Sequence, residues 1–274
     1  MIIANRYLLF NLPTTITMID PQSPQYIAQQ KFLQTQSDLF LTHSQQRSTI
    51  NILWIGCSST NLDDEIRRSP SSHKILQQCL DKATIINPDI EVLTKTHILE
   101  DLNFDHCEGN YSMQWHYCTR PCRISQRKAE KGIADPLTQL YQDLVDWADI
   151  VLVATPIRWW NASSLYYKLV ERLNCIENQK EVYGVDLVHN KLMGCIVMGA
   201  QDGAQHVLGQ MMSVWSELWF AFAKSPYVAY TAGWLLNDHI DLIPQQLERD
   251  QNLIDEMIAE MLHYQFEAIL NRRK

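Results

Sequence analysis

Short apolar runs alternate with segments of helical spacing from about residue 50 to the end of the chain. An apolar run of four to eight residues that stops at a glycine or proline is typical of a buried strand. Apolar residues that recur every three or four positions are typical of a helix with one buried face. Five runs are predicted as strands: 50–55, 90–93, 150–154, 192–198 and 227–230. Five further segments are predicted as helices: 71–83, 136–147, 162–175, 207–223 and 244–270.

This alternation predicts an α/β fold. Parallel strands need crossover connections, and the helical segments supply them on both faces of a sheet. We therefore expect a three-layer sandwich around a five-stranded parallel sheet. In open sheets of this kind, ligands bind outside the carboxyl ends of the strands.

The first part of the chain has a different composition from the rest. Residues 20–48 are rich in Gln, Ser, Thr and Pro, with one amphipathic helix predicted over residues 26–40. We expect an N-terminal extension over residues 1–48 and one domain over residues 49–274. A Cys-containing insert at about residues 100–135 interrupts that domain.

Charge and composition exclude several classes of protein. The formal net charge is -8, and phosphate backbones need clustered Lys and Arg, so nucleic acid is not expected as a partner. No apolar stretch is long enough to cross a bilayer, which argues against a membrane protein. Seven cysteines, an odd number, are spread over the chain and are interpreted as reduced thiols or ligands in the cytoplasm and not as disulfides.

The first predicted strand is followed by a loop rich in hydroxyl side chains. A phosphate monoester needs several N–H and O–H donors that converge on it, and a helix start adds a favourable dipole. The loop and the helix start after it supply such donors without a Lys or Arg. The alternative is a plain Ser-rich helix cap. The candidate phosphate-binding residues are Ser58, Ser59, Thr60, Ser71 and Ser72.

The loop after the 150–154 strand carries two adjacent tryptophans. Pro156 ends the strand and leaves the backbone groups after it free to address the edge of a heterocycle. Trp159 and Trp160 offer flat apolar surface for a ring, and the alternative is that both plug the top of the core. The candidate ring-binding residues are Pro156, Ile157, Arg158, Trp159, Trp160 and Asn161.

Two glycines flank polar residues in the loop after the 192–198 strand. Glycine permits a close approach of the backbone or a positive φ. A tight turn into the next helix is the alternative. The candidate residues here are Gly199, Gln201, Asp202 and Gly203.

Taken together, these residues resemble the NAD(P)H-dependent FMN reductase branch of the flavodoxin-like superfamily. Ser58 falls at the Ser of the Gly-Ser-Pro-Arg loop of that family, while Cys57 replaces its Gly and Thr60 its Arg. The closer match is an acidic residue, an apolar strand, Thr-Pro, an aromatic loop and a helix with Glu-Arg-Leu. It runs here from Asp149 to Leu173. The resemblance implies a flavodoxin-like fold.

The resemblance covers about residues 50–232 and implies a flavoenzyme. FMN would be the cofactor, NAD(P)H the reductant, and a quinone or another small molecule the electron acceptor. No side-chain acid or base is required, so no catalytic residue is named. Arg158 is the one charge expected near the ring, and the alternative is a solvated Arg in the loop. The alternatives are a flavodoxin-type electron carrier without NAD(P)H turnover and a flavin-free flavodoxin-fold binding protein.

The family also implies a homodimer or homotetramer. Its active sites are commonly completed by a neighbouring subunit. The Trp-rich segment 211–222 is a candidate contact surface, although helical spacing of this kind is more often core.

The insert contains Cys107, Cys118 and Cys122. Some relatives carry Cys-x2-Cys runs here that bind an iron–sulfur cluster, but the spacing in this chain is wider. Three thiols and a neighbouring His are a weak candidate for Zn²⁺, and a redox-active or structural thiol loop is another reading. A reduced, partly buried insert without metal is preferred.

Overall fold

Five parallel strands form one sheet in the order β2-β1-β3-β4-β5 within the described residues. The positions that the computed structural model describes are a few single residues before position 48 and the ranges 48–58, 71–86, 89–114, 118–199, 202–231 and 249–273. The strands are β1 (Thr49–Gly56), β2 (Glu91–Ile98), β3 (Ile150–Pro156), β4 (Leu192–Gly199) and β5 (Ala221–Thr231). This order is that of a flavodoxin-like sheet, so the expected fold class is confirmed.

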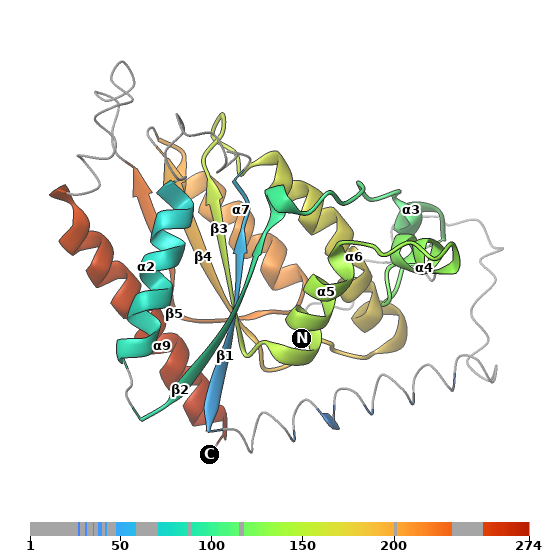
Figure 1. Cartoon of the computed structure of the whole chain (residues 1–274), viewed down its shortest axis with the longest axis horizontal. Coiled ribbons are helices and arrows are strands. Elements are labelled where there is room, and N and C mark those ends of the chain that lie inside the picture. Colours follow the sequence, from blue (N-terminus) through green and yellow to red (C-terminus); the bar gives the residue numbers. More distant parts are fainter. Residues whose placement is uncertain are drawn as a thin grey trace, which may run out of the picture.

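Helices cover both faces of the sheet (Figure 1). One face carries α2 (Ser71–Ile86) and α9 (Gln251–Arg273). The other carries α5 (Leu137–Gln142), α6 (Ser164–Tyr183) and α7 (Ala204–Glu217). No helix in the described part of the chain has the length and apolarity that a membrane span requires.

The alternation of side chains along β1 divides the core into two layers. Ile52 and Trp54 pack among residues of α2 and α9. Leu53 and Ile55 pack on the opposite face, among residues of α6 and α7. Because both faces of a central parallel strand are covered, its sequence is a continuous apolar run.

The boundary between α7 and β5 differs from the prediction. A helix was expected over residues 207–223, but α7 ends at Glu217 and β5 already begins at Ala221. Trp219 adopts a left-handed backbone conformation, with φ 72°, which a helix cannot continue through. The apolar spacing in this segment therefore belongs to two elements. Pro226 lies within β5, where an edge strand tolerates a missing N–H group.

Other elements differ at their ends. β2 continues to Ile98, and its polar, half-exposed residues gave no apolar signal. The helix expected over residues 136–147 is α5 followed by a short π-helix at Asp143–Trp147. The helix expected over residues 26–40, and the part of the last helix before residue 249, lie outside the described residues.

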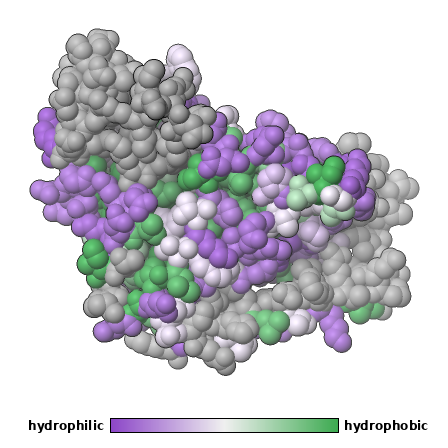
Figure 2. Space-filling view, in the orientation of Figure 1, coloured by the Kyte–Doolittle hydropathy of each residue, from purple (hydrophilic) through white to green (hydrophobic). Residues whose placement is uncertain are grey.

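The insert between β2 and α5 contains three short helical segments: η1 (Leu99–Asp101), α3 (Asn110–Gln114) and α4 (Arg123–Glu130). α3 and α4 lie beyond α6, away from the sheet (Figure 1). In Figure 2, hydrophobic residues on this side of the molecule lie in several separate groups among hydrophilic ones. Ile124 of α4 nevertheless belongs to the same buried cluster as the α6 side of the sheet, so the insert packs against the core.

Gly194 lies where β4 meets α9 at close range. A Cβ atom at this position would come within 2.2 Å of Leu152 Cδ2 and 2.5 Å of Gln265 Nε2. We predict that Gly194→Ala lowers the free energy of unfolding by about 1–3 kcal/mol, because the packed side chains must shift. Urea unfolding followed by circular dichroism measures the change.

Gly209 provides the matched control. It is exposed in α7, and a Cβ atom added there meets no atom within 4 Å. Gly209→Ala is expected to raise stability by about 0.5–1 kcal/mol, as alanine does in an exposed helix. Equal effects of the two substitutions would contradict the packing account of Gly194.

Candidate active site

The loop after β3 forms a tight hairpin with Trp159 and Trp160 at its tip. The Arg158 N–H group donates to the Asn161 carbonyl at 2.7 Å, and the Asn161 N–H group donates back to the Arg158 carbonyl at 2.9 Å. Trp159 and Trp160 have φ values of 50° and 58°. Two positive φ values at the centre of a two-residue loop are typical of a type I′ hairpin turn, whose backbone is the mirror image of a type I turn.

The two tryptophans hold this conformation at a cost. A bulky residue in the left-handed region is destabilised by about 1–2 kcal/mol, and such residues gather at functional sites. Burial does not compensate for the cost at Trp159, whose side chain is 89% exposed, while Trp160 is 48% exposed. The Asn161 side chain donates to the Trp159 carbonyl at 2.8 Å and so stabilises the turn. The hairpin therefore presents flat aromatic surface to solvent.

The loop after β4 packs directly against this hairpin. A Cβ atom on Gly203 would lie 2.5 Å from Trp160 Cδ1 and 3.2 Å from its Cα, and φ at Gly203 is 108°. Both the contact and the backbone therefore require glycine. Four residues earlier, at the end of β4, a Cβ atom on Gly199 would lie 2.7 Å from Ile157 Cδ1. The Ile157 N–H group donates to the Met198 carbonyl at 2.8 Å, which extends the pairing of β3 and β4 into the loops.

The loop after β1 joins the same assembly through Ser163. The Ser163 hydroxyl donates to the Cys57 carbonyl, and its N–H group donates to Thr155 Oγ1 at 3.0 Å. The same hydroxyl caps α6 by accepting from the Tyr166 N–H group at 3.2 Å. Ser163 is therefore the N-cap residue of α6. Three loops of the carboxyl edge are thus linked by direct contacts.

Most of the predicted site residues lie at this edge. Ser58 is buried beside Cys57, and Asp202 is exposed next to Gly203. α2 begins at Ser71, so Ser71 and Ser72 form its first turn. Ser59, Thr60 and Gln201 lie outside the described residues. Sequence reasoning missed Thr155 as the acceptor that holds the N–H group of Ser163 at the start of α6, although the Thr-Pro pair was its signal.

Comparison with models of protein families identifies the family of this chain. A family model described as NADPH-dependent FMN reductase matches residues 68–234, which is more than half of the chain. The chain belongs to this family. It is an NAD(P)H-dependent flavin oxidoreductase that uses FMN as cofactor and NAD(P)H as reductant. The match begins after Cys57 and Ser58.

Solved structures similar to this reductase share its fold. One is RosB with a bound 8-demethyl-8-formylriboflavin-5'-phosphate intermediate, at 15% identity and a TM-score of 0.56, covering 81% of this chain and 79% of that chain. Another is the NAD(P)H:quinone oxidoreductase from Methanothermobacter marburgensis, at 8% identity and a TM-score of 0.51, covering 76% of this chain and 96% of that chain. No curated protein matches the chain.

The edge of the reductase fits the ring of FMN. The N–H groups of Trp159 and Trp160 have no partner within the described part of the chain, and they lie beside exposed aromatic surface. Gly203 brings the backbone of the opposite loop against the hairpin. Ring planes and backbone donors are the groups that bind a flat heterocycle. The start of α2 lies after β1, where a helix dipole favours a phosphate.

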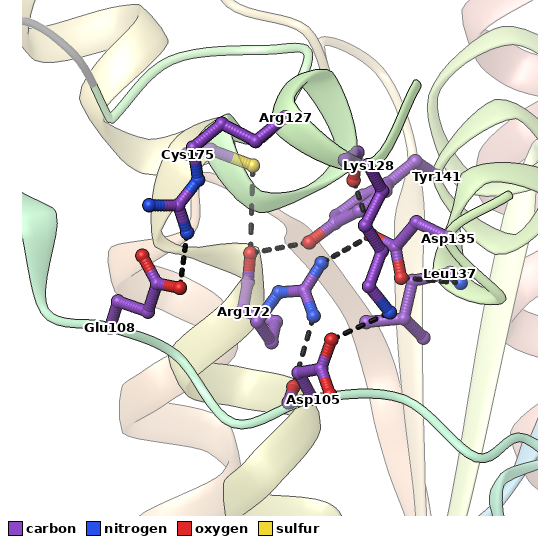
Figure 3. Close-up of polar contacts among 10 residues, drawn as sticks. Asp105, Glu108, Arg127, Lys128, Asp135, Leu137, Tyr141, Arg172 and Cys175 are labelled. Carbon is purple, nitrogen blue, oxygen red and sulfur yellow. Dashed lines mark hydrogen bonds and ion pairs between the residues drawn. The ribbon is translucent and has the colours of Figure 1, made fainter. Parts of the chain in front are cut away.

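The cysteine insert of the reductase lies away from this edge. Among the described residues, no three His, Cys, Asp or Glu side chains are arranged to hold a metal ion, and Cys107, Cys118 and Cys122 form no such group. Sequence reasoning also missed Arg172 of the Glu-Arg-Leu motif, whose side chain is completely buried against the insert (Figure 3).

The hairpin strain predicts the outcome of one substitution. Asn tolerates the left-handed conformation better than Trp, and the Trp159 side chain makes little packing contact. Trp159→Asn is therefore expected to keep or raise the free energy of unfolding, by up to about 1 kcal/mol. Thermal unfolding of the protein without FMN measures this. A loss of more than about 1 kcal/mol would show that Trp159 is a packing residue.

Proposed function

We propose that the enzyme binds the isoalloxazine ring of FMN on the Trp159–Trp160 hairpin and passes electrons from NAD(P)H to a quinone or another small acceptor. The observation that carries the proposal is the contact of Gly203 with Trp160 at the carboxyl edge, next to exposed aromatic surface. FMN supplies the hydride chemistry when bound. The chain supplies the aromatic surface and the backbone donors.

The hairpin, the loop after β4 and Arg158 have separate roles in this proposal. The hairpin stacks its indole rings on the flavin and directs backbone N–H groups at the ring edge. Gly199 and Gly203 allow the loop after β4 to approach the ring closely. Arg158 is exposed and makes no ion pair among the described residues, so its charge is available for the reduced ring or for the phosphate of NADPH.

A quinone is the preferred acceptor because it is small and flat. Such a molecule can stack on a ring that lies open to solvent, as Trp159 does at 89% exposure. Family membership favours the reductase over an electron carrier without NAD(P)H turnover and over a flavin-free binding protein. We further propose a cytoplasmic homodimer or homotetramer in which a neighbouring subunit covers the hairpin.

The Trp-rich segment 211–222 is a poor candidate for that contact. Trp215 and Phe220 are buried within the same chain, with ring centroids 5.2 Å apart in an edge-to-face arrangement. Trp219 is the exposed tryptophan of this segment, at 39%. The subunit contact is therefore proposed at the hairpin and not along α7.

Electron transfer is tested by anaerobic mixing of the FMN-loaded protein with NADPH or NADH. We expect the visible flavin absorbance to bleach, and to return faster on addition of a benzoquinone or naphthoquinone than on addition of free FMN. Faster return with free FMN would contradict the quinone proposal. A flavin that stays oxidised with both coenzymes would contradict NAD(P)H turnover.

The place of the ring is tested by two matched tryptophan substitutions. Trp159→Asn is expected to weaken FMN binding at least about tenfold, which corresponds to about 1.4 kcal/mol of lost stacking. Trp219→Asn is the control, because Trp219 is also partly exposed with a positive φ but precedes β5 at the opposite, amino edge. Fluorescence titration with FMN gives both affinities. Equal affinities for the two variants would exclude the hairpin as the ring site.

A further inference from the structure

Three hydrogen-bonded side chains link α6 and α7 near the carboxyl edge of the sheet. The Tyr167 hydroxyl donates to Gln210 Oε1 at 2.7 Å, and Gln210 Nε2 lies 2.9 Å from His206 Nε2. Tyr167 lies in the first turn of α6 and His206 in the first turn of α7, with Gln210 one turn later. The three residues therefore bridge the two helices that begin directly after the loops of the candidate active site.

His206 lies close to the aromatic hairpin. Gly203 is the N-cap residue of α7, and a Cβ atom there would lie 2.5 Å from Trp160 Cδ1. The Val207 N–H group donates to the Gly203 carbonyl at 3.0 Å, so helical geometry holds from this residue onward. Cβ positions three apart on a helix are about 5–6 Å from each other. The imidazole of His206 is thus placed one helical step from the loop that touches the hairpin.

Tyr167 gives this set of hydrogen bonds a fixed start. Its ring packs edge-to-face on Tyr166, with ring centroids 5.4 Å apart, and Tyr166 is completely buried. The Tyr167 N–H group donates to the carbonyl of Ser163, the N-cap residue of α6, at 3.3 Å. The core therefore sets the place of the Tyr167 hydroxyl, and this hydroxyl orients the amide of Gln210.

The oriented amide determines which nitrogen of His206 carries the hydrogen. Because Gln210 Oε1 accepts from Tyr167, the NH2 group of the same amide faces the imidazole. An amide NH2 group is a donor only, so His206 Nε2 accepts, and in the uncharged imidazole the ring hydrogen lies on Nδ1. His206 is exposed, and its Nδ1 atom has no hydrogen-bond partner in the described part of the chain. The Nδ1–H group is therefore a donor available to a bound molecule.

We propose that His206 is a substrate-binding residue of the reductase, whose Nδ1–H group donates a hydrogen bond to a carbonyl oxygen of a quinone. This inference rests on the proposed function, since it takes the hairpin as the place of the ring and a quinone as the acceptor. Gln210 and Tyr167 act through His206 and are positioning residues.

The hydrogen bond becomes stronger as the quinone is reduced. A quinone that takes up one hydride becomes a hydroquinone anion with negative charge on an oxygen atom, and one proton from solvent completes the hydroquinone. A donor already placed where this charge develops lowers the barrier. His206 keeps its own hydrogen throughout, because the amide of Gln210 cannot pass a proton to Nε2. Ferricyanide has no carbonyl oxygen and takes up no hydride, so its reduction gains nothing from this donor.

The first experiment compares these two acceptors in the FMN-loaded protein at about pH 8, where an ordinary imidazole is uncharged. The protein is reduced anaerobically with one equivalent of dithionite, so that the result does not depend on NAD(P)H, and is mixed with a naphthoquinone or with ferricyanide. The return of flavin absorbance gives both rates. We expect His206→Leu to slow the quinone reaction about three- to tenfold, the effect of one lost hydrogen bond, and to leave the ferricyanide reaction unchanged.

Two further variants serve as controls. His206→Asn keeps a side-chain N–H group close to the place of Nδ1 and should retain most of the quinone rate. His189→Leu should leave both rates unchanged, because His189 is also exposed but lies before β4, at the amino edge. Circular dichroism and flavin absorbance show that each variant is folded and holds FMN.

The second experiment reads the tautomer directly, by ¹⁵N NMR of the imidazole in the oxidised, FMN-loaded protein at about pH 8. We expect the Nδ1–H form for His206 in the wild type. Gln210→Leu removes the amide donor, so the ring should shift toward the Nε2–H form that free histidine prefers. The same variant should slow the quinone reaction and spare the ferricyanide reaction.

Three results would overturn this inference and leave the proposed function standing. The first is a quinone rate in His206→Leu equal to that of the wild type. The second is an equal loss with quinone and ferricyanide, which would indicate a change in the flavin site itself. The third is an Nε2–H tautomer of His206 in the wild type. Wild-type protein that passes no electrons to the quinone would overturn the proposed acceptor, and this inference with it.

Discussion

Parallel pairing of β1, β3 and β4 is the constraint on which the whole site depends. These three strands are neighbours, and their register brings Gly56, Ala154 and Ile196 into line across the sheet. The loops that follow them must therefore emerge at one edge. Ser163 ties the first loop to the second, and Gly203 ties the third to the second. An aromatic hairpin with costly backbone conformations is held in place by these contacts.

Much of this arrangement could be predicted from the sequence because the central strands are buried on both faces. The apolar runs of β1, β3 and β4 have no other interpretation once helical segments separate them. The length of β2 was underestimated because a half-exposed edge strand carries polar residues such as Lys95 and His97. The length of α7 was overestimated because the apolar residues Trp219 and Phe220 fit both helical and strand spacing. Only the positive φ of Trp219 shows that the helix has ended before them.

The candidate site was also predicted only in part from the sequence. The loop positions of Trp159, Trp160 and Gly203 followed from the ends of apolar runs, but the hairpin and its positive φ values did not. No residue type normally associated with such a turn is present, since two tryptophans occupy the places where Asn and Gly are usual. Arg172 was missed for a related reason. A buried cation is recognisable only when its partners, Asp135 and the Asp105 carbonyl, are placed in space.

The central claim is that the flavin ring lies on the aromatic hairpin at the carboxyl edge. The most direct measurement is a crystal structure of the protein with FMN bound, read for the position of the isoalloxazine ring. The account predicts ring density against the indoles of Trp159 and Trp160 and beside the Gly203 backbone. Density at the amino edge, or a ring separated from the hairpin by other side chains of the same chain, would contradict it.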